Sequence, residues 1–232
     1  MRRMFVVATV VAVLLAACAV QVPRSPGSEE QRPSGFPDNF YQRSADGGRP
    51  VFRIEPARSL VVIEVRRGGS LANLGHDHVI ASHNVRGYVA PSDARADLFI
   101  SLGELVIDEP ELRVQAGFDT QPPDAAIAGT RENMLRQFHA EQHSYAVISV
   151  AGVDADATGP WLNASITLNG ITRAVRIPVK IEQTADQLIV NGRVALEQTS
   201  FGIVPFSILG GALQVQDRVD VRFVIHASRV PS

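Results

Sequence analysis

Two histidines separated by one residue are the side chains best placed to bind a metal ion or a polar ligand. His76 and His78 lie in the stretch LANLGHDHVIASHNVRG, residues 71–87. Alternate side chains of a β-strand share a face, so both imidazoles would point the same way. Two imidazoles on one face are a known metal-ligand geometry, but a zinc site needs further ligands. His83 would face the opposite side unless the backbone bulges, so this stretch alone gives an incomplete site.

Known catalytic patterns are missing from the sequence. It contains no Gly-x-Ser-x-Gly nucleophile elbow, no P-loop and no dinucleotide-binding fingerprint. Two carboxylate pairs, Asp108/Glu109 and Asp154/Asp156, lie in segments expected to be turns, where solvated charge is the simpler interpretation. The sequence therefore predicts that the chain is not an enzyme and needs no catalytic cofactor.

Several aromatic side chains would suit an apolar ligand, although packing in a protein core explains such residues equally well. These candidates are Phe138, Trp161, Phe201 and Phe206. The segment FGIVPFSILGGAL, residues 201–213, is unusually apolar for a loop. It has two interpretations: a lid that closes over a pocket, or one more buried strand.

The elements that must position these residues show strict alternation of apolar and polar residues. In RAVRIPVKIE, residues 173–182, every second residue is Val or Ile, and RVDVRFVIHA, residues 218–227, repeats the pattern. This period of two is typical of half-buried strands. Asn169-Gly170, just before the first of these segments, is a strong signal for a tight hairpin turn.

About eight strands and little helix are expected. Helical spacing occurs near residues 130–139, with Thr130 as a plausible N-cap. Eight strands joined mostly by short turns favour an all-β antiparallel barrel or sandwich. An eight-stranded barrel is wide enough to hold one small ligand.

The first residues predict export and lipid anchoring. MRRMFVVATVVAVLLAAC has two arginines and then an apolar run too short for a confident membrane span. Its end, Leu-Ala-Ala-Cys, resembles a bacterial lipobox, so we expect residues 1–17 to be a signal peptide and Cys18 to be acylated. Cys18 is the only cysteine of the chain, so it has no partner for an internal disulfide. Ala19 after the cysteine implies sorting to the outer membrane, facing the periplasm.

Composition divides the remaining chain in two. Residues 18–50 are rich in Pro, Ser, Gly and charge, which predicts a flexible tether. Residues 51–232 have the size and composition of one globular domain. Cleavage before Cys18 would remove two of the 22 basic residues, leaving 20 against 24 acidic ones. Such a balance gives no indication of nucleic-acid binding.

From about Val51 to its end, the chain resembles the YceI family. The resemblance depends on five segments in a characteristic order: GHDHVIASHNVRGYV, TRENMLRQFHAEQHSYAVISV, ITLNGITRAVRIPV, SFGI and VQDRVDVRFVIHA. It implies one lipocalin-like antiparallel β-barrel of about eight strands, with one or two short helices and an apolar tunnel. It also implies a periplasmic protein that binds long polyisoprenoid or quinone-like lipids. One departure is Gln198-Thr199, where family members often carry Arg.

The leading hypothesis is an exported, lipid-anchored protein that binds a long isoprenoid or quinone-like lipid in an apolar tunnel. Its partners would be this lipophilic molecule and the membrane, reached through the acyl anchor. We expect His76 and His78 at the tunnel mouth, where they would contact the ligand's polar end. One alternative is a metal-binding or metal-dependent protein that uses His76 and His78 as ligands. Another is an envelope stress or assembly factor that acts by protein contact.

Overall fold

The computed structural model describes residues 31–231. The expected signal peptide, residues 1–17, and the expected acylation site, Cys18, lie outside the described residues. All elements of the fold belong to one compact unit, Arg32–Ser232. No helix among the described residues is long and apolar enough to cross a membrane.

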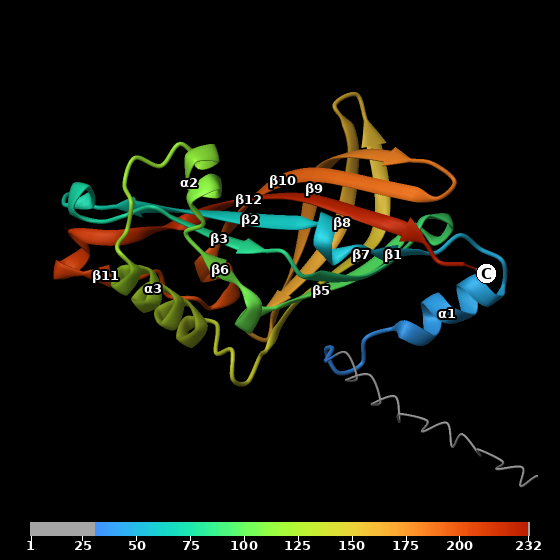
Figure 1. The fold of residues 1–232 in the computed structure, drawn as a ribbon, viewed down its shortest axis with the longest axis horizontal. Helices are drawn as coiled ribbons and strands as arrows, with labels where there is room; N and C mark the ends of the chain where they lie inside the picture. Colours follow the sequence, from blue (N-terminus) through green and yellow to red (C-terminus); the bar gives the residue numbers. More distant parts are fainter. Residues whose placement is uncertain (1–30, 232) are drawn as a thin grey trace, which may run out of the picture. The chain divides into compact units, whose positions relative to one another are not determined.

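Eight antiparallel strands close into a barrel, as the sequence predicts (Figure 1). They follow the order β1-β4-β5-β7-β8-β9-β10-β12, and pairing of β12 with β1 closes the ring. Their bounds are β1 Phe52–Ile54, β4 Val85–Ala90, β5 Arg95–Ser101, β7 Tyr145–Asp156, β8 Gly159–Leu168, β9 Ile171–Gln183, β10 Gln187–Glu197 and β12 Leu213–Arg229. The expected fold class is confirmed.

A second group of strands extends the sheet beyond the barrel. Strand β12 is 17 residues long, and its first part pairs with β2 instead of β1. Strand β2 then pairs with β3, and β3 with β6. The bounds are β2 Leu60–Gly68, β3 His78–Ser82, β6 Val106–Ile107 and β11 Ser207–Ile208, the last paired with β12. Figure 1 shows helices α2 and α3 beside this extension.

The predicted alternation is confirmed in the two strands on which it was based. In β9, Ile177 is buried while its neighbours Arg176 and Pro178 are exposed. In β12, Val219 and Ile225 are buried. Side chains of alternate residues therefore enter the barrel, and the polar residues between them face outward.

Three α-helices are present among the described residues, where one or two were expected. Helix α3 spans Asp124–Gln137, so Thr130 lies inside the helix and is not its N-cap. The helix starts directly after Pro123, because a proline ring cannot continue a helix in the N-terminal direction. Helix α2, Pro110–Ala116, has proline as its first residue and Gly117 after its last, which are ordinary start and stop signals.

Helix α1, Asp38–Asp46, corrects the expected extent of the tether. Its Tyr41 is only 2% exposed and packs in a cluster with Val51 and Ala90. The Tyr41 hydroxyl donates a 2.8 Å hydrogen bond to the buried Asp97 of β5. Average composition indicated a flexible segment, but the buried side chains of Tyr41 and Ser44 hold this helix against the barrel.

Six 3₁₀ turns connect the elements of the described chain: η1 Pro56–Arg58, η2 Ala72–Leu74, η3 Pro91–Asp93, η4 Leu102–Glu104, η5 Gln198–Phe201 and η6 Leu209–Gly211.

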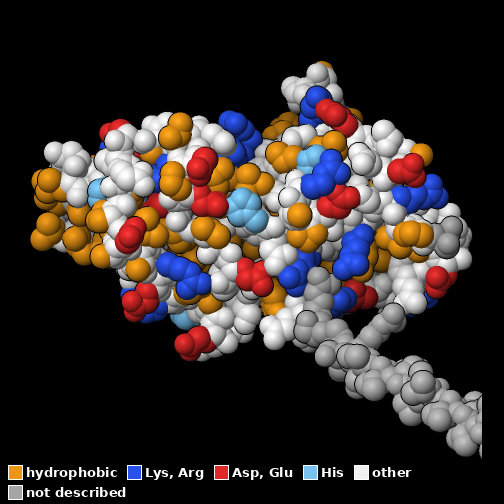
Figure 2. Space-filling model, in the orientation of Figure 1, with side chains coloured by type: hydrophobic (Ala, Val, Ile, Leu, Met, Phe, Trp, Pro, Cys, Tyr) orange, Lys and Arg blue, Asp and Glu red, His pale blue; other side chains and the backbone are white. Residues whose placement is uncertain are grey.

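The apolar segment 201–213 fits neither of its two interpretations. Phe201 and Ile203 are buried, whereas Phe206 and Leu209 are exposed, the latter by 70%. Figure 2 shows hydrophobic side chains gathered at the end of the sheet extension where β11 lies. The segment is therefore neither a buried strand nor a part of the cavity wall described below.

Candidate functional site

The barrel encloses an apolar cavity of about 390 Å³. All residues that line it are apolar except Arg95 and Gln183. They are Val61, Ile63, Val85, Val89, Pro91, Ala94, Arg95, Ala96, Leu98, Ile100, Ala146, Ile148, Val150, Val153, Leu162, Ile166, Leu168, Ile177, Ile181, Gln183, Leu188, Val190, Val194, Leu196, Val221, Phe223 and Ile225. The expectation of an apolar interior lined from alternate strand positions is confirmed.

Strand β10 shows how the sequence builds the wall. Leu188, Val190, Val194 and Leu196 line the cavity from every second position, and only the place of Gly192 lacks a side chain. A Cβ atom at Gly192 would lie 2.4 Å from the Phe223 ring, which occupies that place from the neighbouring strand. Glycine is required here because no larger residue fits against the ring.

The two polar lining residues lie toward the same end of the cavity. Gln183 is the last residue of β9, and Arg95 is the first residue of β5. Arg95 Nε donates a 2.8 Å hydrogen bond to Asp97, and its guanidinium lies 4.3 Å from the centre of the Phe40 ring of α1. This hydrogen bond raises the pKa of Arg95 and keeps its charge paired with Asp97. The cavity itself therefore contains almost no group that could bind a charge or catalyse a reaction.

Asp97, the carboxylate that pairs with Arg95, has hydrogen-bond partners for both of its oxygens. Asp97 is 4% exposed and accepts hydrogen bonds from Tyr41, Arg95 and Ser149. Burial, followed by the hydrogen bond to Asp97, raises the pKa of Tyr41. This network attaches α1 to the outer face of β5, next to the polar end of the cavity.

The histidine pair lies elsewhere, which corrects its expected position at the cavity mouth. His78 begins β3, and His76 precedes that strand. Their ring centres are 6.5 Å apart, and neither residue lines the cavity. The reason is topological, since β3 pairs with β2 and β6 in the extension.

His78 is part of a buried ionic cluster instead. His78 Nδ1 lies 2.6 Å from Asp108 Oδ2, while Arg113 Nη1 donates a 2.6 Å hydrogen bond to Asp108 Oδ1. The Val79 amide donates to the same Asp108 oxygen at 3.0 Å. Burial raises the pKa of Asp108, but these hydrogen bonds outweigh it, so the pKa lies below the ordinary value for aspartate.

This cluster also corrects the interpretation of Asp108 as a solvated turn residue. Asp108 and Arg113 are 2% and 1% exposed. Arg113 also donates to the Asp77 and Thr120 backbone carbonyls. The cluster therefore ties α2 and the following loop to the start of β3, which is a structural role.

A metal centre on the histidine pair would need further ligands. His83 is exposed and its Nε2 lies 2.8 Å from Glu109 Oε2, away from the pair. Within residues 31–231, no three His, Cys, Asp or Glu side chains lie close enough together to hold a metal ion. Among these residues the histidine pair therefore remains a pair, without a third ligand of these types beside it.

The four aromatic candidates are not brought together, and none of them lines the cavity. Phe138 and Phe201 are buried in the main hydrophobic cluster. Trp161 lies under the guanidinium of Arg176, 5.1 Å away, and Phe206 is 46% exposed. The residues that do form the wall are mostly aliphatic, with Phe223 as the aromatic exception, and the alternation of the strands was the signal that could have identified them.

Comparison with known proteins adds three observations. A model of the YceI-like domain matches residues 52–227. A polyisoprenoid binding domain from Saccharophagus degradans has a similar structure, with 12% identity, a TM-score of 0.53 and coverage of 77% of this chain and 98% of that domain. BcnA from Burkholderia cenocepacia is 15% identical with a TM-score of 0.48, and covers 75% of this chain and 98% of its own.

The comparison with curated proteins gave no match. At such low identity, the structural likeness to the Saccharophagus domain shows a shared fold and no more. The domain match is stronger evidence of family, since it begins with β1 and covers all eight barrel strands except the last two residues of β12. The chain therefore belongs to the family of proteins with a YceI-like domain.

Proposed function

We propose that this protein binds an isoprenoid or quinone-like lipid, with the hydrocarbon chain inside the barrel and the polar end at the rim. The observation that carries the proposal is the 390 Å³ cavity, whose lining is apolar except for Arg95 and Gln183. An apolar cavity of this size is in the range of small-molecule sites. It excludes ligands that must bury charge, because burial of an unpaired charge is very costly.

The energetic basis is removal of apolar surface from water. A hydrocarbon chain gains about 25 cal/mol for each Å² that it buries. No catalytic group is needed, and none is part of the proposal. The structurally similar Saccharophagus domain, described as polyisoprenoid binding, supports the choice of ligand class.

Mass spectrometry of organic extracts tests this function. We expect the purified full chain to release a lipophilic molecule with an isoprenoid chain in near-stoichiometric amount. The same chain after delipidation and refolding serves as a second sample, and it should bind the extracted lipid again. Extracts without any lipid, together with no rebinding, would contradict the proposal.

We also propose that the chain is exported and anchored in the bacterial outer membrane through acylated Cys18. Support comes from Arg2, Arg3, the apolar run and Leu15-Ala16-Ala17-Cys18. Acyl chains would give firm anchoring, since each buried CH₂ contributes about 0.8 kcal/mol. In a bacterial host, labelled palmitate should enter the wild-type chain and not Cys18→Ser. Equal labelling of both chains would refute the anchor and leave lipid binding untouched.

A further inference from the structure

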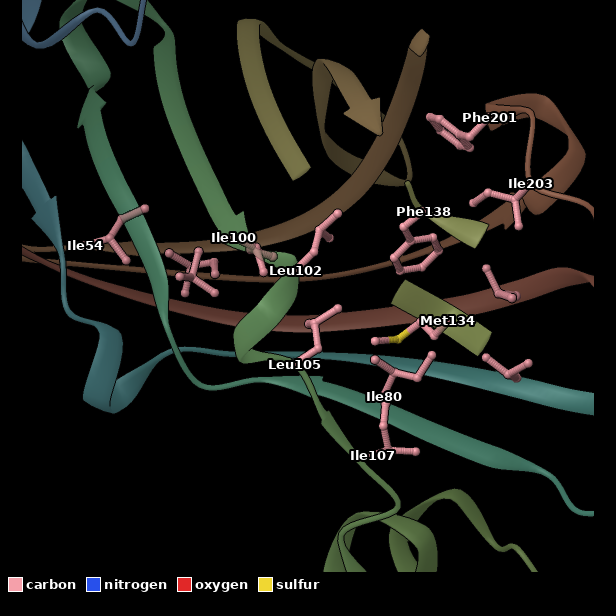
Figure 3. Packing of buried hydrophobic residues seen from close by; sticks show 14 of the residues in the cluster. Ile54, Ile80, Ile100, Leu102, Leu105, Ile107, Met134, Phe138, Phe201 and Ile203 are labelled. Atoms are coloured by element: carbon pink, nitrogen blue, oxygen red, sulfur yellow. The ribbon is translucent and has the colours of Figure 1, made fainter. Parts of the chain in front are cut away.

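Buried side chains from the ends of α3 and η5 lie near the turn where β8 finishes and β9 begins, beyond the residues that line the cavity. Phe138, at the end of α3, and Phe201, at the end of η5, are 9% and 3% exposed. Met134 and Ile203 pack with them in the same cluster (Figure 3). We call these four residues the plug.

Cavity-lining residues contact the cluster that contains the plug. Leu168 and Leu196 line the cavity and also pack against this cluster. The side chain of Asn169, next to Leu168, donates a hydrogen bond to the Phe201 carbonyl at 3.2 Å. Phe201 is therefore held at the end of the barrel where β8 finishes and β9 begins.

The polar end lies at the opposite end of the same strands. Strand β9 runs from Ile171, which pairs with Leu168, to Gln183, which pairs with Leu188. A chain inserted from the Gln183 end would thus keep its polar group at the rim and direct its apolar terminus toward the plug. Such a chain would have one orientation, and its depth would be limited at the β8–β9 end.

The volume sets that limit. An apolar cavity of about 150 Å³ holds benzene, with its six carbons, so 390 Å³ has room for roughly 15 carbons. Further carbons would have to remain outside the barrel, where they bury little apolar surface and add little to the binding free energy.

We propose that Phe138 and Phe201 determine the ligand chain length, and that the site selects single-chain lipids with roughly 15 carbons inside the barrel. This inference rests on the proposed lipid-binding function and narrows its ligand class. Both residues act by shape, since their rings occupy the space that a longer chain would need. Ala146, which lines the cavity and pairs with Ile100 near the inner end, offers the opposite test.

Binding of linear prenols to the purified full chain tests the proposal. The series is geraniol, farnesol and geranylgeraniol (C10, C15 and C20), each measured by displacement of a fluorescent fatty-acid probe. For wild type, we expect affinity to rise about tenfold or more from C10 to C15, and by less than about threefold from C15 to C20. Phe201→Ala and Phe138→Ala should restore a rise of about tenfold from C15 to C20.

Milder variants guard against loss of the fold. Phe201→Leu should also let affinity rise from C15 to C20, but by less than Phe201→Ala does. Ala146→Leu should have the opposite effect, so that affinity stops rising at a chain length nearer C10. Trp161→Leu, which removes an aromatic ring away from the plug, is the matched control and should keep the wild-type dependence of affinity on chain length.

A wild-type affinity that keeps rising to C20 would overturn the length limit alone, and so would a limiting chain length that no variant changes. No binding at any length would overturn the proposed function and the length limit together.

Discussion

Asp108→Ala is expected to lower the free energy of unfolding by about 3–5 kcal/mol at pH 7. The substitution leaves the guanidinium of Arg113, which is 1% exposed, without its carboxylate partner. It also removes an acceptor from the Val79 amide and from His78. An uncompensated buried charge is the costly part, more than the loss of the pair itself. Urea denaturation followed by circular dichroism measures the difference.

Glu109→Ala is the matched control. Glu109 is the next residue along the chain, and it pairs with the exposed His83. Exposed pairs contribute at most about 1 kcal/mol, so this variant should remain close to wild type. The double variant Asp108→Ala/Arg113→Met should recover much of the lost stability, because no charge is then left unpaired. Equal stabilities of Asp108→Ala and Glu109→Ala would show that the buried cluster is not the main support of α2.

The difference in unfolding free energy between wild type and Asp108→Ala should depend on pH in a definite direction. The folded-state pKa of Asp108 lies below its ordinary value, so folding favours the ionised form. The carboxylate therefore adds stability that is fully present above its unfolded pKa of about 3.9 and is lost as pH falls through the folded pKa. The gap between wild type and Asp108→Ala should therefore narrow as the pH falls below 4. A gap that narrows toward high pH would contradict the assignment.

The barrel could be predicted because its signals are local. Each wall strand shows by alternation which of its side chains point inward, as Ile177 and Ile181 of β9 do. The resemblance to a known family then predicted that the strands close into a barrel. The hairpin at Asn169-Gly170 also forms as expected between β8 and β9. These properties depend on neighbours within a few residues, which a sequence displays directly.

The polar clusters could not be predicted, because their partners are distant in sequence. Asp108 and Glu109 look equivalent along the chain, yet one is fully buried and the other is at the surface. The difference comes from His78, 30 residues away, and from Arg113, which is close in sequence but belongs to α2, a helix that packs on β3. Likewise, nothing local shows that Tyr41 hydrogen-bonds Asp97, 56 residues later.

The histidine pair was placed at the wrong position for a related reason. Local spacing put His76 and His78 on one strand face, but could not show that β3 leaves the barrel and joins the extension. Which end of the barrel carries polar groups depends on the strand order that brings Arg95 and Gln183 to the same end of the cavity. Alternation therefore identifies the wall, whereas the mouth and the plug require the assembled structure.

Val194→Trp is expected to abolish lipid binding without loss of the fold. Val194 lines the cavity from the middle of β10 and pairs with Val221, another wall residue. The indole ring would occupy space that the hydrocarbon chain needs. Each 100 Å² of chain surface kept out of the cavity costs about 2.5 kcal/mol, which is roughly a 60-fold loss of affinity. Displacement of the fluorescent fatty-acid probe by farnesol measures this loss.

Ala195→Trp is the matched control, because it introduces the same residue one position later. Ala195 is exposed on the outer face of β10, so its new indole would project into solvent and leave the cavity unchanged. Farnesol should bind this variant as it binds wild type, and both variants should unfold at similar urea concentrations.

If both variants kept full affinity, the ligand would have to bind outside the barrel, and the cavity would be only a packing defect. If both lost it equally, the effect would come from β10 itself and not from the space that it encloses. Only a difference between the two faces of this strand assigns binding to the interior.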